Sequence, residues 1–339
     1  MNIGELEAVA RSLVAPGKGI LAADESAPTI EKRFKGIEVP STEENRRAYR
    51  DLLFTTPGMS EFISGVILYD ETIRQGSADG TPFTRVLESR GILPGIKVDE
   101  GTKALTGFPG EKITEGLDGL RKRLPEYRSR GARFAKWRAV IDIGDGIPTR
   151  YCIEANAHAL ARYAALCQEA GLVPIVEPEV LMDGGHTVGR CEEVTMEVLS
   201  LVYAQLTAHR VALEGTLLKP NMVVSGKLCP VQAGAPQVAE ATVRTLRRCV
   251  PPAVSGIVFL SGGQTPRQAT EHLNAMNTLG KQPWELSFSY GRALQDPVLK
   301  AWKGKAENVP AAKEAFLLRS KLNGAARYGK YSPAMEGAA

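Results

Sequence analysis

The stretch Leu213-Glu-Gly-Thr-Leu-Leu-Lys219, followed at once by Pro220, has the character of a short strand that ends in a lysine. A strand that runs through a core carries its terminal ammonium into a region with little water, which disfavours the charged amine. A neutral amine is a nucleophile toward a ketone or aldehyde carbonyl. The alternative is a lysine that merely ends a strand and extends its ammonium to water. The segment alone leaves both interpretations open.

Seven other apolar runs resemble this one, and each is followed by a turn and a longer helical pattern. Several are nearly continuous in Ile, Val, Leu and Phe, which is typical of strands buried on both faces of a parallel sheet. The eight predicted strands are 19–24, 63–69, 95–99, 134–143, 172–177, 213–219, 256–260 and 285–290. Between them, apolar residues recur at steps of three and four, as in 153–167, which predicts amphipathic helices.

Eight strand–helix units in 339 residues predict a single α/β domain, residues 1–339, folded as a (β/α)8 TIM barrel. The alternative is an open doubly wound sheet. Its usual signature after the first strand, Gly-x-Gly-x-x-Gly, is absent, and Ala22-Ala-Asp-Glu-Ser26 stands there instead. From about residue 326 the chain becomes poor in large apolar residues, so we expect a mobile C-terminal tail.

The composition indicates which classes of binding partner the protein has. The residues are 43% hydrophobic and 24% charged, which is typical of a globular protein, and the net charge is +4. The basic residues are dispersed, so we expect no nucleic-acid partner, and a mild positive balance suits anionic small molecules. Five widely spaced cysteines and four scattered histidines predict neither a disulfide framework nor a metal site. With no membrane span or signal peptide in the pattern, we expect a cytoplasmic protein.

Polar residues collect where the predicted strands end, which is where barrels of this kind carry their active sites. Residues two apart on a strand share a face, as Lys136 does with Arg138, Glu177 with Glu179, and Lys97 with Asp99. Any one such pair is explained equally well as a structural ion pair. The whole set at one end points instead to catalysis, in which neighbouring cations favour one neutral amine and a carboxylate moves protons. The set is Asp24, Lys97, Lys136, Arg138, Glu177, Glu179 and Lys219.

The last two strand ends suggest phosphate binding. Ser261-Gly262-Gly263 offers backbone N–H groups that no Cβ obstructs, and Ser289-Tyr-Gly291-Arg292 adds a bidentate cation. Loops after the seventh and eighth strands are the recurrent phosphate site of such barrels. A second anion site could be built from Ser26, Arg33 and Lys97.

These segments resemble the class I, Schiff-base fructose-bisphosphate aldolases. The resemblance runs in the family's order from about residue 16 to residue 331. Its motifs are Gly17-Lys-Gly-Ile-Leu-Ala-Ala-Asp-Glu-Ser26, Thr42-Glu-Glu-Asn-Arg-Arg47, Gly95-Ile-Lys-Val-Asp99, Phe134-Ala-Lys-Trp-Arg138, Val173-Pro-Ile-Val-Glu-Pro-Glu179, Leu213-Glu-Gly-Thr-Leu-Leu-Lys-Pro-Asn-Met222, Phe259-Leu-Ser-Gly-Gly-Gln264 and Phe288-Ser-Tyr-Gly-Arg-Ala-Leu294.

The resemblance implies a role for each matching residue. Lys219 would form the Schiff base, Glu177 would be the main proton-transfer group and Lys136 would assist at the carbinolamine. Asp24 would act near the substrate hydroxyls, and Glu179 would orient the lysines. Ser261, Gly262, Gly263, Ser289 and Arg292, with Gly291 between the last two, would bind one phosphate. Ser26, Arg33, Lys97 and Arg138 would surround the other phosphate or the sugar chain.

The implied activity is reversible cleavage of fructose 1,6-bisphosphate to glycerone phosphate and glyceraldehyde 3-phosphate by a homotetramer without a metal or other cofactor. Members of the animal and plant type end in a tyrosine, whereas the last tyrosine here is Tyr331. Either a tail is missing from this sequence or a shorter form uses another proton donor for the enamine. The rival functions are another Schiff-base barrel enzyme, such as a transaldolase-like one, and a non-catalytic phosphosugar-binding or cytoskeletal interaction protein.

Overall fold

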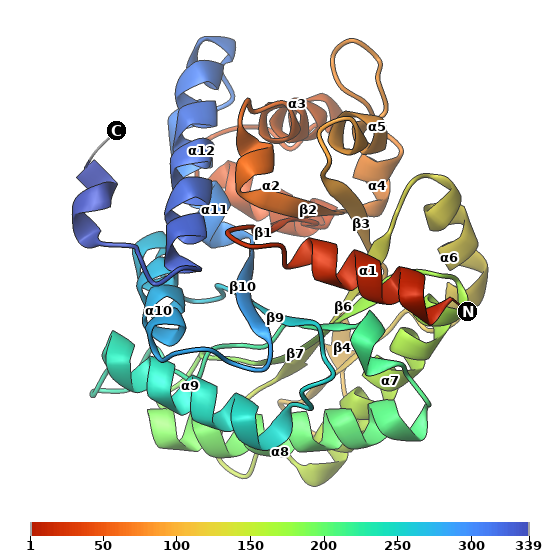
Figure 1. Cartoon of the computed structure of the whole chain (residues 1–339), viewed down its shortest axis with the longest axis vertical. Coiled ribbons are helices and arrows are strands. Elements are labelled where there is room, and N and C mark those ends of the chain that lie inside the picture. Colours follow the sequence, from red (N-terminus) through yellow and green to blue (C-terminus); the bar gives the residue numbers. More distant parts are fainter. Residues whose placement is uncertain (1, 338–339) are drawn as a thin grey trace.

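Eight parallel strands close into a barrel in the computed structural model, which describes residues 2–337 (Figure 1). Around the barrel the strands follow one another as β1 (Gly19–Ala23), β10 (Glu285–Tyr290), β9 (Gly256–Phe259), β8 (Leu217–Leu218), β7 (Val173–Val180), β6 (Phe134–Ile141), β3 (Leu93–Lys97) and β2 (Ile63–Leu68). A separate antiparallel pair, β4 (Thr102–Ala104) and β5 (Lys112–Thr114), lies between β3 and β6 in the chain. The predicted TIM barrel is therefore confirmed.

Helices surround the barrel (Figure 1). The α-helices are α1 (Ile3–Leu13), α2 (Ala27–Lys35), α3 (Glu43–Phe54), α4 (Asp70–Ile73), α5 (Phe83–Glu88), α6 (Leu120–Ser129), α7 (Arg150–Glu169), α8 (Val188–Ala208), α9 (Ala235–Cys249), α10 (Pro266–Thr278), α11 (Arg292–Trp302) and α12 (Val309–Ala326). Short 3-10 turns are η1 (Met59–Glu61), η2 (Leu213–Gly215), η3 (Ala306–Asn308) and η4 (Pro333–Gly337). None of the helices described is long and apolar enough to cross a membrane.

Side chains and helix α1 together close the N-terminal end of the barrel. Phe134, Ile175 and Leu217 project from the strands into a cluster that also contains Leu6 and Leu13 of α1. In Figure 1, α1 lies across this end of the barrel. Because apolar side chains fill that half of the interior, the polar residues of the strands are left at the C-terminal end.

The register of the ladder decides which polar residues meet there. On β6 and β7, Arg138 pairs with Glu177 and Val140 pairs with Glu179. Between β3 and β6, Lys97 is level with Lys136. Since alternate residues of a strand point to the same face, this register brings lysines and carboxylates of three strands together at the C-terminal end of the barrel.

The predicted strands agree with the observed ones except near Lys219. The run 213–219 is strand only at Leu217–Leu218, because Leu213–Gly215 forms a 3-10 turn. The ladder nevertheless continues to Lys219, whose N–H donates to Val176 O at 2.8 Å. Pro220 has no N–H to extend the pairing toward β7, although its carbonyl accepts from Leu260 N–H at 3.1 Å on the β9 side. Backbone hydrogen bonds on both sides thus hold the chain at Lys219.

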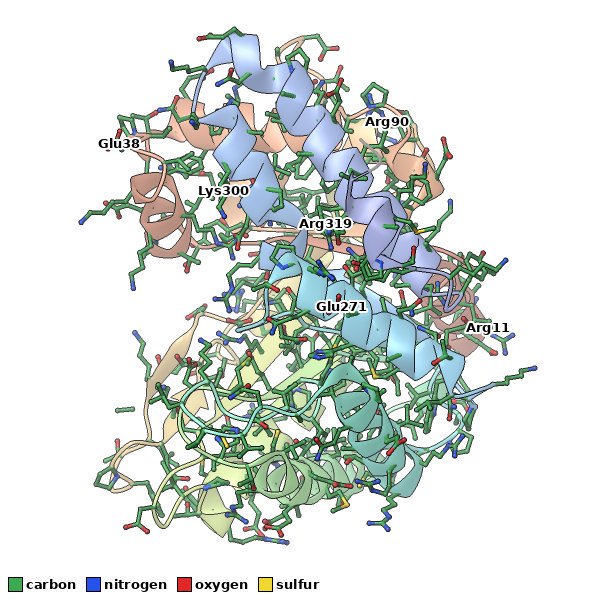
Figure 2. All side chains as sticks on the ribbon, turned by 90° about the vertical axis from the view of Figure 1, so that its left-hand side faces the viewer. Arg11, Glu38, Arg90, Glu271, Lys300 and Arg319 are labelled. Carbon is green, nitrogen blue, oxygen red and sulfur yellow. The ribbon has the colours of Figure 1, made fainter. Side chains whose placement is uncertain are left out.

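The segment after α12 packs against α10 and α12. Tyr331 is buried, and its backbone N–H donates to Asn274 Oδ1 at 2.9 Å. Arg319, which Figure 2 shows among these helices, donates through Nη1 to both carboxylate oxygens of Glu336 at 2.7 Å. Its other terminal nitrogen donates to Pro266 O at 2.8 Å. Mobility of the tail stays a prediction, and its last residues, 338–339, lie outside the described chain.

Candidate active site

A cavity of about 410 Å³ opens at the C-terminal ends of the barrel strands. All the site residues predicted from the sequence line it, except Gly263. They are Asp24, Ser26, Arg33, Lys97, Lys136, Arg138, Glu177, Glu179, Lys219, Ser261, Gly262, Ser289, Gly291 and Arg292. The fold therefore gathers residues from seven strand ends and from α2 and α11 around one space.

Lys219 and Lys136 are bridged by one carboxylate at the bottom of this cavity. Glu177 Oε1 lies 3.2 Å from Lys219 Nζ, and Glu177 Oε2 lies 3.4 Å from Lys136 Nζ. All three side chains are at most 5% exposed. A carboxylate in contact with both amines is placed to pass a proton to or from a group bound at either one.

Lys136 is the centre of the ionic cluster. Its Nζ lies 2.7 Å from Asp24 Oδ2 and 3.8 Å from Asp99 Oδ2, in addition to Glu177. Burial disfavours the ammonium, but the carboxylates of Asp24, Glu177 and Asp99 outweigh it and raise the pKa of Lys136 above its ordinary value. Lys136 is therefore a cation in the ligand-free site.

Asp24 is correspondingly held as a carboxylate. Burial by itself raises the pKa of Asp24, but Lys136 and then Lys219 and Lys97 lower it well below its ordinary value. The sequence predicted cations that act on one another, whereas the structure places carboxylates between them. That the surroundings favour a neutral Lys219 amine stays a prediction.

Two further ion pairs stand above this cluster. Lys97 Nζ lies 2.7 Å from Asp99 Oδ1, and Arg138 Nε contacts Glu179 Oε2. Asp99 also accepts from the backbone N–H of Arg138 at 3.2 Å. These contacts orient Lys97 and Arg138 on the wall formed by β3 and β6, so that both cations line the cavity.

The opposite wall has the features of an anion site. Ser261 and Ser289 are buried, and Ser289 Oγ has no hydrogen-bond partner within residues 2–337. Ser261 Oγ accepts from the backbone N–H of Ala293 at 3.4 Å, in the first turn of α11. Arg292 makes no ion pair in the described part of the chain. A helix start, hydroxyl groups and a guanidinium without a partner together favour a phosphate group.

Glycine is required in the turn after β9. A Cβ on Gly262 would lie 2.8 Å from Glu179 Oε1, which is already tight. Gly263 has φ +75°, and a Cβ there would meet Met182 Sδ at 2.1 Å. Gly263 itself lines a neighbouring cavity of about 330 Å³, together with Arg292. The backbone of this turn therefore packs closely against Glu179 and Met182, where a side chain on either glycine would not fit without a shift.

Three polar lining residues were missed by sequence reasoning, namely Glu25, Thr29 and Lys32, and the apolar residues Ala22 and Leu260 also line the cavity. Thr29 and Lys32 lie on α2, and the spacing of Ser26, Thr29 and Arg33 is that of one helix face, so the helical pattern could have found them. No local signal identifies Glu25, because its partners lie on other helices.

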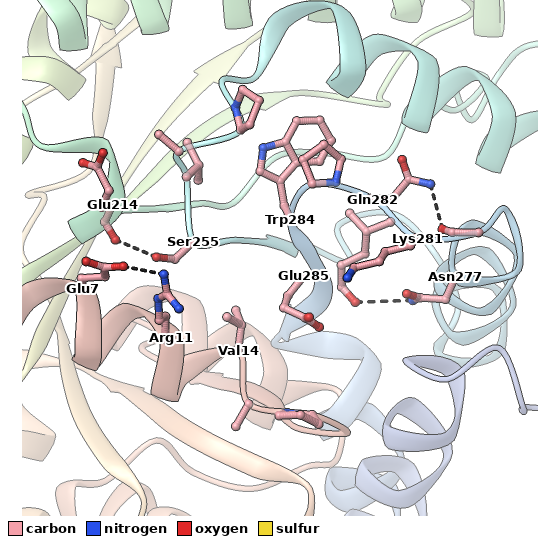
Figure 3. Close-up of a pocket in the computed structure, with 18 residues that line it drawn as sticks. Glu7, Arg11, Val14, Glu214, Ser255, Asn277, Lys281, Gln282, Trp284 and Glu285 are labelled. Atoms are coloured by element: carbon pink, nitrogen blue, oxygen red, sulfur yellow. Dashed lines mark hydrogen bonds and ion pairs between the residues drawn. The ribbon is translucent and has the colours of Figure 1, made fainter.

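A larger cavity, of about 750 Å³, lies at the other end of the barrel (Figure 3). It is lined by α1, by the segment before β9 and by the segment between α10 and β10, and Trp284 forms part of its wall. Charges of both signs line it, and Arg11 is paired with Glu7 (Figure 3). None of the predicted site residues lines the cavity of 750 Å³. The cavity of 410 Å³ is therefore the candidate active site, although it is the smaller of the two.

The donor set of the site is not that of a metal centre. Within residues 2–337, no group of three or more His, Cys, Asp or Glu side chains is arranged to hold a metal ion. The carboxylates of the cavity are instead in contact with lysine and arginine.

A closed (β/α)8 barrel with a buried lysine and a carboxylate at the C-terminal strand ends defines a barrel enzyme of the imine-forming type. Comparison with known proteins gives the family. Residues 5–339 match the family described as "Glycolytic: Fructose-bisphosphate aldolase class-I". The chain therefore belongs to the class I fructose-bisphosphate aldolase family, whose members are aldehyde-lyases that use a Schiff-base lysine rather than a metal.

Individual relatives agree. The chain is 58% identical to a "Probable fructose-bisphosphate aldolase class 1" of Xanthomonas campestris pv. campestris, over 98% of this chain and 99% of the relative. It is 58% identical to a "Fructose-bisphosphate aldolase" of Dictyostelium discoideum, over 97% and 93% of the two chains. The solved fructose-bisphosphate aldolase of Plasmodium falciparum superposes with a TM-score of 0.96 at 52% identity, covering 97% of this chain and 96% of that one.

Proposed function

We propose that the chain cleaves fructose 1,6-bisphosphate reversibly to glycerone phosphate and glyceraldehyde 3-phosphate, with Lys219 as the Schiff-base residue. The observation that carries this assignment is the contact of Glu177 with both Lys219 and Lys136 at the end of a sealed barrel. Family membership supports the phosphorylated sugar as substrate.

The first half of the reaction forms an imine. The neutral amine of Lys219 attacks the C2 ketone, and the carbinolamine loses its hydroxyl as water after accepting a proton from Glu177. Lys136, whose Nζ lies 3.4 Å from Glu177 Oε2, assists at this step. The product is a protonated imine between Lys219 and C2.

The second half breaks the carbon chain. The C4 hydroxyl gives its proton to the carboxylate of Glu177, which lost its own to the departing water. The C3–C4 bond breaks, and its electron pair enters the imine to form an enamine. Glyceraldehyde 3-phosphate leaves as the aldehyde. Protonation of the enamine at C3 and hydrolysis of the imine then release glycerone phosphate and restore the amine. Asp24 is the carboxylate nearest the substrate hydroxyls in this proposal. Glu179 was expected to orient the lysines, but its observed partner is Arg138, which we propose it orients.

Phosphate groups set the register of the substrate. We assign one phosphate to Ser261, Gly262, Gly263, Ser289, Gly291 and Arg292, and the other end of the substrate to Ser26, Arg33, Lys97 and Arg138. Arg33 also lies beside Gly291, so it borders the first phosphate site as well. Anchoring both ends holds C2 at the Lys219 amine, which contributes orientation rather than chemistry.

Borohydride trapping tests the assignment. The protein is incubated with glycerone phosphate, reduced and digested, and the modified peptide is identified by mass spectrometry. We expect one adduct, on Lys219. Lys219→Met is expected to abolish trapping and cleavage while the circular dichroism spectrum is retained. An adduct on another lysine, or none, would refute the mechanism.

A substrate panel separates this proposal from its rivals. Cleavage rates are measured for bisphosphate and monophosphate ketoses with EDTA present. We expect cleavage of fructose 1,6-bisphosphate that EDTA does not reduce. A transaldolase-like enzyme would instead transfer the three-carbon unit to an acceptor aldehyde, and a protein with only a binding or cytoskeletal role would not turn over.

We further propose that residues 1–339 act as one domain in a cytoplasmic homotetramer. The location is supported by relatives named cytosolic in Arabidopsis thaliana and cytoplasmic in Spinacia oleracea. The tetramer is supported by the family resemblance, and light scattering coupled to size exclusion checks it. A monomeric mass at micromolar concentration would contradict it.

A further inference from the structure

We propose that Glu25 is a positioning residue that presents Arg33 to the anion site at the start of α11. Glu25 follows Asp24 at the end of β1, but its side chain contacts a different set of groups. Its Oε1 contacts Arg33 Nη1, and its Oε2 accepts from Arg50 Nη2 at 2.7 Å. The Glu25 side chain is 4% exposed, so these contacts are formed away from water. The inference rests on the proposed function, in that the anion is taken to be a substrate phosphate.

Glu25 and Arg33 both line the cavity, and Arg33 is the more exposed of the two. Arg33 lies on α2 and lines the same cavity as Gly291 and Arg292. A Cβ placed on Gly291 would lie 3.8 Å from Arg33 Nη2, so the guanidinium stands directly beside the backbone that leads into α11. Arg33 therefore belongs to the wall that carries Arg292 as well as to the α2 side of the cavity mouth.

The Glu25 carboxylate is itself held in place by buried polar side chains. Gln295 of α11 donates through Nε2 to Glu25 Oε1 at 2.9 Å and to Ala22 O at 2.7 Å. Gln295 Oε1 in turn accepts from Tyr49 OH at 3.0 Å and lies 3.4 Å from Arg50 Nη1. Gln295, Tyr49 and Arg50 are all buried. The carboxylate is held in one orientation by groups from β1, α3 and α11, which is what placing a long side chain requires.

The charges of this group explain why it favours an anion. Two guanidinium groups share one carboxylate, so the three side chains together keep one positive charge. Arg50 is enclosed, with a side chain 3% exposed, whereas Arg33 is 19% exposed and faces the cavity. The surplus charge is therefore available only through Arg33. A free arginine loses about 2 kcal/mol of rotamer entropy when it is ordered, and Glu25 has already ordered this one.

The test compares Glu25→Gln with the wild type by two measurements. Calorimetric titration with inorganic phosphate measures anion binding without turnover, and steady-state kinetics give KM and kcat for fructose 1,6-bisphosphate. We expect phosphate affinity to fall and KM to rise about tenfold, which corresponds to about 1.4 kcal/mol, while kcat changes less than threefold. In an Arg33→Gln background, Glu25→Gln is expected to add less than twofold, because it acts through Arg33.

Folding defects are controlled in two ways. Glu25→Gln leaves the buried Arg50 without a charge partner, so Glu25→Gln with Arg50→Met provides a second variant without that buried charge. Glu285→Gln is the matched control, because it removes the carboxylate partner of the buried Arg327 at the opposite end of the barrel. We expect Glu285→Gln to leave KM and phosphate affinity unchanged.

Each outcome is decisive. Unchanged phosphate affinity in both Glu25 variants overturns the proposal. Tighter phosphate binding also overturns it, because Glu25 would then hold Arg33 back from the anion rather than present it. A wild-type protein that binds phosphate but does not cleave the bisphosphate would refute the proposed function and leave the Glu25–Arg33 comparison interpretable.

Discussion

Replacing Lys136 by methionine removes the ammonium that three buried carboxylates share. Its Nζ lies 2.7 Å from Asp24, 3.4 Å from Glu177 and 3.8 Å from Asp99. Asp24 loses most, because the other two carboxylates retain an ion pair with a neighbouring lysine. Breaking a buried ion pair by removing one partner costs about 3–5 kcal/mol. We expect Lys136→Met to lose about that much of its free energy of unfolding near pH 8.

The dependence on pH distinguishes this cause from a packing defect. In the wild type the pKa of Asp24 is lowered, so its contribution is present above its ordinary pKa of 3.8 and is lost only as the pH falls through the lowered value. The pKa of Lys136 is raised, so its contribution is complete below 10.5 and is lost as the pH rises through the raised value. These two groups therefore make no change in wild-type stability between about pH 5 and pH 8.

In Lys136→Met the sign reverses. Asp24 then loses its nearest counter-charge, and we expect the effect of burial, which raises its pKa, to outweigh the remaining lowering by Lys219 and Lys97, so that the pKa rises above the ordinary value. A carboxyl group with a raised pKa destabilises the fold when it is ionised, so the variant regains stability as the pH falls. Each unit by which that pKa exceeds the ordinary one corresponds to about 1.4 kcal/mol. We expect part of the deficit to disappear between pH 8 and pH 5.

Urea denaturation followed by tryptophan fluorescence at pH 8 and pH 5 measures both quantities, at matched protein concentrations. Lys112→Met is the control, because Lys112 pairs with Asp142 at 3.0 Å but is 41% exposed, and such pairs contribute about 1 kcal/mol or less. A deficit for Lys136→Met below 1 kcal/mol at pH 8, or a deficit equal at both pH values, would refute the reasoning.

Three further outcomes follow from the contacts. Glu177→Gln is expected to lower kcat by about 10²–10⁴ with retained fold, since proton transfer contributes that much, and a kcat within tenfold of wild type would contradict its role. Gly95→Ala places a Cβ 2.3 Å from the ring of Phe134 inside the barrel, and we expect the free energy of unfolding from thermal denaturation to fall by about 1–3 kcal/mol. An unchanged melting temperature would show that the ring moves aside without cost. Glu336→Gln weakens the contacts of Arg319, so we expect the free energy of unfolding to fall by about 1–3 kcal/mol and amide hydrogen exchange in residues 327–337 to become faster. Unchanged exchange would mean that this ion pair does not hold the segment in place.

Local pattern predicted the fold well because each βα unit carries its own signals. Apolar runs of strand length, separated by amphipathic helices, indicated eight parallel strands, and β8 alone was much shorter than its run. There Gly215 lies in a 3-10 turn, and the proline at 220 has no N–H to continue the pairing toward β7, so two residues of regular pairing suffice to place Lys219. The strand propensity of residues 213–219 indicated a strand there, whereas contacts with the neighbouring strands decided how many of these residues form regular pairs.

The sequence by itself determined which residue types end the strands, because strand alternation and the direction of a parallel barrel send them all to one end. Only the tertiary structure decided which charges touch. Glu177 lies between Lys219 and Lys136 because of the barrel's register, and Glu25 meets Gln295 across 270 residues of chain. Such partners are set by packing between distant elements, and ionic contacts in a buried site depend on distances that no local pattern encodes.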